Sequence, residues 1–294
     1  RVFICAGTHD PGLKGNEAPI SKLKKSFSEN GISQYSAHVH DFANDPLIDA
    51  GKTRQGTPVL YNAQLDDLEA FVVFSDVKPH YFAGYSNPVK YFVPGVCGYA
   101  TAQANHSLTM DSRSTFGMHP WHPEPARRDN HLAADQIEAM DKILKDRPVW
   151  ALTTVTGQAM LGPIQDVCEQ AFTLTDRTLC RQVQPARYVI VSPGGMPNDI
   201  DLYISQRALE LSKQAMLDGG EVFFASACPQ GVGPEHSRRN FYDKLIGPLD
   251  EVLQAADTEY ERYAHKPYRF AQLIHRLEKL WMYSEIPGKQ ILAM

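Results

Sequence analysis

The sequence predicts an α/β fold in two domains, each with a mainly parallel sheet flanked by helices. Short apolar or β-branched runs alternate with stretches of helical apolar spacing along the whole chain. Between residues 187 and 228 the order is strand, loop, helix, stop and strand, which is typical of the crossover that joins parallel strands. A break at RQVQPA (181–186) divides the chain into domains over 1–185 and 186–294.

Each expected element has its own local signal. In the first domain, VFICAG is a short buried strand, and NEAPISKLKKSFSENG is a helix that ends at Asn30-Gly31. The stretch DNHLAADQIEAMDKILKD has helical spacing, and YSAHVHDF, TPVLYN, LEAFVVFSDV and VWALTTVT are strand-like. In the second domain, RYVIVS, EVFFASAC and KLWMYSEI are strands, and IDLYISQRALELSKQAML is a helix.

Composition and charge exclude several classes of protein. The 294 residues carry a net charge of -5, so no basic face for nucleic acid is expected. No apolar run reaches the roughly 18 residues of a membrane helix, and no signal peptide is visible. Five scattered cysteines without a CxxC pair favour a reducing, cytoplasmic location over a disulfide framework or a structural zinc site. Because Arg1 begins inside an apolar run and GKQILAM ends abruptly, we expect truncation at both ends.

Three polar loops follow predicted strands. They are GTH, KPHYFAG and SPGGMPND. Loops after parallel strands gather at one edge of the sheet, where α/β proteins bind ligands. We therefore expect these loops to form a cleft.

The segment from Pro79 to His106 holds His80, Lys90 and His106 in apolar surroundings broken by Gly and Pro. An imidazole can ligate nickel, zinc or copper, or move protons near neutral pH. A lysine in apolar surroundings loses its proton more easily and can become a nucleophile or a covalent anchor. The alternative is a loop with surface histidines and a solvated lysine.

Other histidines carry weaker signals. His9, at the end of a predicted strand, is either a general base or a cap. His38 and His40 would share one strand face, which is also chelate geometry, and His119 and His122 lie in a Pro-rich loop. Histidines in such places are more often structural.

The loop SPGGMPND contains Gly194 and Gly195 and precedes a helix, whose first N–H groups can hold phosphate. The alternative is a tight turn with acidic residues that complement the helix dipole. Tyr203 and Arg207 are four residues apart and would face one direction. An arginine there could hold a carboxylate at two points, or simply lie on the surface.

Taken together, these blocks resemble the lactate racemase family, whose members use a nickel-pincer nucleotide. The matching blocks are AGTH (6–9), PHYFAGYS (79–86) followed by Lys90, PGVCG (94–98), ANH (104–106) and SPGGMPNDIDLY (192–203). They occur in the family's order, and GGEVFFASACPQGVG (219–233) is similar to the family's second domain. Several blocks in order are far more specific than any one motif.

The resemblance implies a racemase or epimerase of a 2-hydroxy acid that works by reversible hydride transfer to the covalently bound cofactor. By the same resemblance, Lys90 is the covalent attachment point, and His106 completes the nickel coordination. His9 and His80 are the two acid/base groups, one for each hand of the substrate. Tyr203 and Arg207 are substrate-facing, Gly194 and Gly195 contact the cofactor, and the enzymes that make the cofactor are the implied partners.

This chain departs from the family's pattern at several positions. Asp10 stands where members commonly have arginine, Ile204 where lactate racemase has glutamine, and Arg207 where it has lysine. These changes indicate a substrate other than lactate. The family's early Asp-x-Thr-Arg segment is absent, which we attribute to truncation.

Three alternatives stay open at this point. The first is a different reaction on the same cofactor, either epimerisation of a sugar acid or one-way redox chemistry. The second is a nickel- or cofactor-binding homologue without turnover. The third, a zinc hydrolase that uses His38 and His40 with a third ligand, leaves Lys90 unused.

Overall fold

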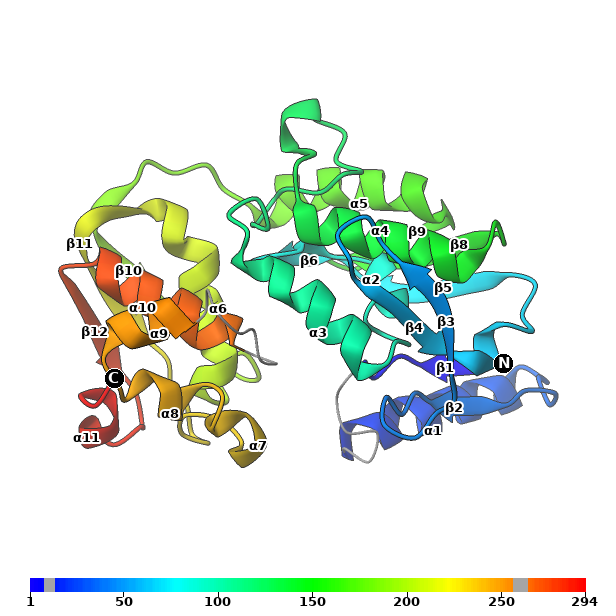
Figure 1. The fold of residues 1–294 in the computed structure, drawn as a ribbon, viewed down its shortest axis with the longest axis horizontal. Helices are drawn as coiled ribbons and strands as arrows, with labels where there is room; N and C mark the ends of the chain where they lie inside the picture. The colour runs from blue at the N-terminus through cyan, green and yellow to red at the C-terminus, as the bar shows by residue number, and fades with distance from the viewer. Residues whose placement is uncertain (8–13, 256–263) are drawn as a thin grey trace.

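The structure, a computed structural model, describes residues 1–7, 14–255 and 264–294. Its strands and helices are interspersed along the chain (Figure 1). The strands are β1 Val2–Ile4, β2 Ala37–Val39, β3 Leu47–Lys52, β4 Pro58–Asn62, β5 Phe71–Asp76, β6 Lys78–His80, β7 Gly84–Ser86, β8 Val149–Val155, β9 Gln158–Pro163, β10 Ala186–Val191, β11 Met216–Ala225 and β12 Lys279–Tyr283. The α-helices are α1 Lys14–Glu29, α2 Val89–Phe92, α3 Tyr99–Ser107, α4 His131–Leu144, α5 Ile164–Leu179, α6 Leu202–Ser212, α7 Glu235–Arg238, α8 Tyr242–Leu245, α9 Leu249–Ala255, α10 His265–Arg276 and α11 Gly288–Ile291.

In the first half of the chain, a three-stranded sheet has the order β5-β8-β9. Strands β5 and β8 are parallel, and β8 and β9 form an antiparallel hairpin. Side chains alternate between the two faces of a strand, so Val73 enters the core while Val72 and Phe74 lie on the exposed face. Helix α5 packs against β8 and β9 and contributes Phe172 to the same core.

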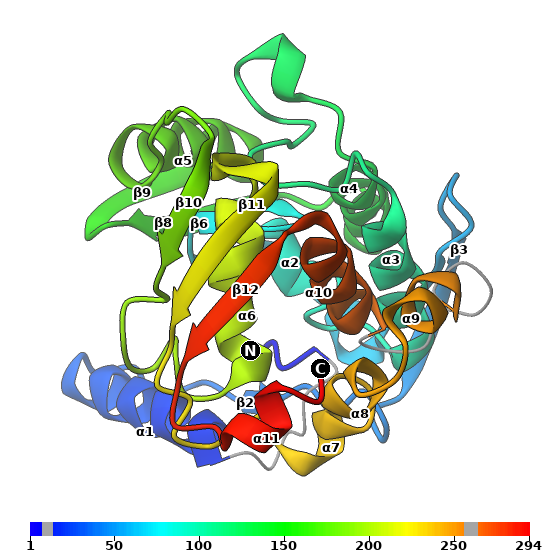
Figure 2. The same cartoon turned by 90° about the vertical axis from the view of Figure 1, so that its left-hand side faces the viewer.

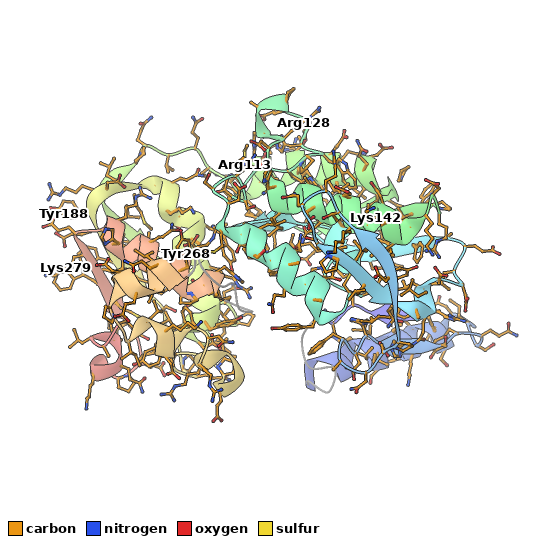
Figure 3. The ribbon with its side chains drawn as sticks, in the orientation of Figure 1. Arg113, Arg128, Lys142, Tyr188, Tyr268 and Lys279 are labelled. Carbon is orange, nitrogen blue, oxygen red and sulfur yellow. The ribbon has the colours of Figure 1, made fainter. Side chains whose placement is uncertain are left out.

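The second half is built on the parallel sheet β10-β11-β12. Helices α6 and α10 pack against each other and against this sheet, on the side that faces the first half (Figures 1 and 2). Val222 and Phe224 point into the core beneath the helices. Tyr188 and Lys279 lie on the outer face of the sheet, away from the first half (Figure 3).

The two main hydrophobic cores lie in different halves of the chain, and Arg269 of α10 links the halves. One core gathers side chains between Phe3 and Leu174, and the other gathers side chains between Val189 and Met294. The guanidinium of Arg269 donates to the main-chain carbonyls of Tyr81, Thr109 and Ser114, at 3.4, 2.7 and 2.8 Å. A division into domains near residue 185 is consistent with these cores and stays a prediction.

The α/β class predicted from the sequence is confirmed, with one difference in detail. Besides its parallel pairs β1-β2 and β5-β8, the first half contains antiparallel ladders at β3-β4, β6-β7 and β8-β9. The prediction of a mainly parallel sheet did not include these antiparallel hairpins. Within the described ranges, none of the helices has the length and apolarity needed to cross a membrane.

Candidate active site

His80 lies at the end of β6, in a tight hairpin. Its Cα is paired with that of Gly84 at the start of β7, and the turn residues between them are buried. Gly84 has a φ of +75°, and a Cβ there would lie 1.9 Å from the carbonyl oxygen of Met118. Only glycine fits this position, so Gly84 fixes how the hairpin presents His80.

Lys90 projects from the short helix α2 toward His80. The Nζ atom of Lys90 is 2.9 Å from Nε2 of His80 and 5.4 Å from the centre of the Phe82 ring. The helix begins where Oδ1 of Asn87 accepts the N–H of Val89, at 2.9 Å. The sequence motif therefore brings its lysine and its first histidine into direct contact.

Burial and neighbouring cations favour the neutral form of both groups. Burial lowers the pKa of Lys90 to about 7, with further lowering from Arg207 and Lys78. Burial also lowers the pKa of His80 well below its ordinary value, helped by the charges of Lys90 and Arg207. A neutral imidazole can accept a proton, and a neutral amine can attack a carbon centre.

His106 lies in the last turn of α3. Its Nδ1 is 2.8 Å from the carbonyl oxygen of Ala102, and only an N–H can donate to a carbonyl. The neutral ring then carries its lone pair on Nε2, the form that binds metals. The neighbouring Asn105 is buried and donates to Asp135 of α4, at 2.9 Å, which fixes the helix that carries His106.

The second half adds His265 and Lys266, from the start of α10, and Arg207 of α6. His265 is 2% exposed, and its ring centre is 6.0 Å from that of His106 and 5.3 Å from that of Phe82. The charge of Arg207 acts on both His80 and Lys90, although the guanidinium itself is exposed. The site therefore contains groups from both halves.

Sequence reasoning missed His265 and Lys266. A signal existed, because Lys266, Phe270 and Leu273 have the spacing of one helix face, and this face is buried. That pattern places a lysine on the apolar side of α10, where a charged side chain is rarely buried unless it is paired. The pattern alone does not predict which other side chains Lys266 would contact.

Three further predicted site residues, Tyr203, Gly194 and Gly195, lie on α6 or in the loop before it. Tyr203 is 9% exposed and belongs to the second core, with Lys266 Nζ 3.3 Å from the centre of its ring. Gly194 and Gly195 lie in the loop before α6, with φ of +89° and +84°, and a Cβ at either would meet nothing within 4 Å. His9 lies outside the described residues.

The four other histidines singled out in the sequence, His38, His40, His119 and His122, lie in structural surroundings. Nε2 of His40 lies 2.9 Å from the carbonyl oxygen of Cys97, and His38 is 2.7 Å from Asp45. His122 contacts Asp176 at 3.2 Å, and burial lowers the pKa of His119 to about 3. Within residues 1–7, 14–255 and 264–294, no three His, Cys, Asp or Glu side chains are grouped to hold a metal ion.

The described residues fit a cofactor that brings its own metal donors. They offer one imidazole nitrogen, on His106, rather than a protein-only metal site. They also offer the Lys90 amine, whose pKa is lowered to about 7, so that its neutral form can bond covalently to such a group. A zinc hydrolase centred on His38 and His40 finds no such support, because Asp45 and Cys97 already engage those rings.

Comparison with known proteins agrees with the motifs. The model of the lactate racemase N-terminal domain matches residues 3–117. The chain is 25% identical over 250 residues to a lactate racemase from Thermoanaerobacterium thermosaccharolyticum and 23% identical over 274 residues to one from Lactiplantibacillus plantarum. These matches cover 82% and 88% of this chain but only 55% and 59% of the relatives. The chain therefore spans a little over half the length of each.

Solved structures show the same fold. The lactate racemase apoprotein from T. thermosaccharolyticum superposes with a TM-score of 0.83 at 20% identity, covering 99% of this chain and 69% of that one. A protein from Thermotoga maritima gives a TM-score of 0.66 at 15% identity, covering 99% and 77%. Residues 3–117 are thus similar to the lactate racemase N-terminal domain, and the chain as a whole shares the fold of the lactate racemase apoprotein.

Proposed function

We propose that the whole protein is a racemase or epimerase of a 2-hydroxy acid that uses a nickel-pincer nucleotide attached to Lys90. The observation that carries the proposal is the meeting of His80, Lys90 and His106 with Arg207 of the second half. The curated relatives, which are lactate racemases, support the reaction class. The changes at Ile204 and Arg207 favour a substrate other than lactate.

The residues of this chain would have separate roles in the reaction. When bound, the cofactor would supply an acceptor for the C2 hydrogen and its bonding electron pair. His80 would take the hydroxyl proton from one hand of the substrate, and its lowered pKa keeps it neutral for that task. His9 would serve the other hand. Nε2 of His106 would bind the nickel.

Arg207 would bind the substrate carboxylate. Arg207 lies at an exposed position of α6. A guanidinium can grip a carboxylate with two parallel hydrogen bonds, which fixes the orientation of C2. Tyr203, one turn earlier on α6, would line the same region, and the loop with Gly194 and Gly195 would contact the cofactor.

The test is the mass and metal content of the protein produced together with the cofactor-making enzymes. We expect nickel and an added mass on the Lys90 peptide, and interconversion of the two hands of a 2-hydroxy acid. His106→Ala should lose at least tenfold in retained nickel while it keeps the adduct on Lys90. Unmodified Lys90, with the pathway shown to work on a known family member, would contradict the proposal.

A further inference from the structure

Three imidazole rings surround the ring of Phe82. The ring centres of His80, His106 and His265 lie 4.4, 5.7 and 5.3 Å from the centre of the Phe82 ring. Each imidazole stands edge-on to that ring, at angles of 78°, 71° and 78°. His80 and His106 come from the first half, whereas His265 is the first residue of α10 in the second half. His265 is therefore as close to Phe82 as the two histidines that have roles in the proposed function.

His265 is a buried polar side chain that the proposed mechanism does not use. It is 2% exposed, and its ring centre is 6.0 Å from that of His106. The next residue, Lys266, contacts a different element. Its Nζ donates to the carbonyl oxygen of Tyr203 on α6, at 2.7 Å. The first turn of α10 thus contacts α6 through Lys266 and the histidines of the first half through His265.

One substituent of the substrate has no partner in the mechanism described above. C2 of a 2-hydroxy acid carries a hydroxyl, a hydrogen, a carboxylate and C3. For the hand whose hydroxyl meets His80, the hydrogen goes to the cofactor and the carboxylate meets Arg207. The group on C3 is left. A substrate that lies between His80 and His106 is also beside His265, because all three rings contact Phe82.

We propose that His265 determines substrate specificity by a hydrogen bond to a hydroxyl on C3. The substrates are then 2,3-dihydroxy acids, the class that includes sugar acids. This inference rests on the proposed function and names its substrate class. The nitrogens of an imidazole donate or accept hydrogen bonds, and a hydroxyl can do both. The methyl group of lactate can do neither, and a site that binds a hydroxyl discriminates strongly against an analogue without it.

Glycerate and lactate differ only in the hydroxyl on C3, so the test compares these two acids. We would produce the whole protein together with the cofactor-making enzymes. Chiral chromatography then gives kcat/KM for the interconversion of the two hands of each acid. We expect kcat/KM to be higher for glycerate by about tenfold or more. An equal or lower value for glycerate would overturn the proposal.

Substitution of His265 shows whether this side chain causes the preference. His265→Phe keeps an aromatic ring beside Phe82 and removes both nitrogens. Its kcat/KM for glycerate should fall by about tenfold or more, while that for lactate should change little. His275→Phe, at an exposed position of the same helix, is the matched control and should keep the preference. A wild-type preference for glycerate in folded His265→Phe would contradict the role of His265.

A conservative variant separates the hydrogen bond from the shape of the ring. The amide of His265→Gln can still donate and accept, so this variant should retain more of the preference for glycerate than His265→Phe. Equal losses in the two folded variants would contradict the hydrogen bond. If neither variant folds, the comparison of glycerate with lactate in the wild type still decides the proposal.

Nickel content and intact mass separate a specificity role from a role at the metal. His265→Phe should retain the nickel and the added mass on the Lys90 peptide at wild-type levels, because His265 contacts the substrate only. Loss of nickel from this variant would show that His265 acts on the metal, and the proposal would fail.

The same measurements distinguish this inference from the proposed function. If Lys90 of the wild type stays unmodified, the proposed function falls, and the substrate class falls with it. If the adduct and nickel are present and lactate is interconverted as efficiently as glycerate, the proposed function stands and the role of His265 falls. A loaded protein that prefers glycerate, and loses this preference in His265→Phe, supports both.

Discussion

Gly84 shows how a single residue holds the histidine–lysine pair in place. Glycine lets the backbone approach a neighbouring group closely. In the structure the close partner is the chain itself. A Cβ on Gly84 would lie 1.9 Å from Met118 O, and a Cβ on Gly95 would lie 2.2 Å from Tyr91 O. These glycines allow the chain to pack tightly against itself around the site.

Two alanine substitutions separate lack of space from backbone strain. In Gly84→Ala the new Cβ meets a carbonyl, so the hairpin must shift, and we expect a loss of about 3 kcal/mol or more in unfolding free energy. In Gly194→Ala, where φ is also positive but the space is open, the loss should be about 1 kcal/mol. Urea unfolding measures both, and equal losses would show that packing against Met118 is not what requires glycine.

At the scale of elements, Arg269 ties α10 to the hairpin and to α3. It contacts Glu210 of α6 at 3.3 Å, and both side chains are nearly buried. The same guanidinium donates to the carbonyl of Tyr81, next to His80, and to that of Thr109, just after α3. It therefore fixes the position of α10, which carries His265, relative to the elements that carry His80 and His106.

A double-mutant cycle measures this connection. Arg269→Gln leaves the Glu210 carboxylate buried without its arginine, so we expect a loss of about 3 kcal/mol in unfolding free energy. Glu210→Gln in that background should recover part of the loss, because a neutral amide then replaces the buried carboxylate and Lys213, its other partner, is partly exposed. Urea midpoints of the four proteins give the coupling. Additive losses would mean that Arg269 acts through the carbonyls alone.

Elements with strong local signals were predictable, and short ones were not. β8 and β10 are apolar, β-branched runs between turns, and α4 has clear helical spacing, so each can be recognised in isolation. β6 and β7 have three residues each, too few to show a period. Their hairpin exists because it packs around Gly84, and that is a tertiary contact.

For the whole molecule, buried ionisable groups predict how stability changes with pH. Lys90 and Lys266 have lowered pKa values, so the unfolded chain binds more protons from about pH 7 upward and stability rises with pH. Above about pH 9 the buried thiols of Cys97 and Cys168 act oppositely. Their pKa values are raised, so the unfolded chain loses these protons first and stability falls.

Urea unfolding of the cofactor-free protein between pH 6 and 10 checks this expectation. The wild type should be most stable between about pH 8 and 9. Lys90→Met removes one of the lysines that bind protons more tightly in the unfolded chain, so the stability of this variant should rise less between pH 7 and 9. An identical rise in this variant would show that Lys90 is not held neutral in the folded chain.

The sequence revealed only part of the candidate site. His80, Lys90 and His106 lie within one stretch and belong to one motif, so reading along the chain could find them. His265 lies 159 residues after His106 and joins the site only because α10 packs against the first half. No local sequence pattern predicts this contact, because it depends on how the two halves of the chain pack together.

Arg269 makes its contacts with the first half through main-chain oxygens, which every residue type possesses. Mutations at positions 81, 109 and 114 can therefore change the side chain without removing the acceptor. The guanidinium has no such freedom, because the ammonium of lysine lacks the rigid fork of five N–H donors. Among related sequences we therefore expect arginine at position 269 even where the residue at position 81 differs.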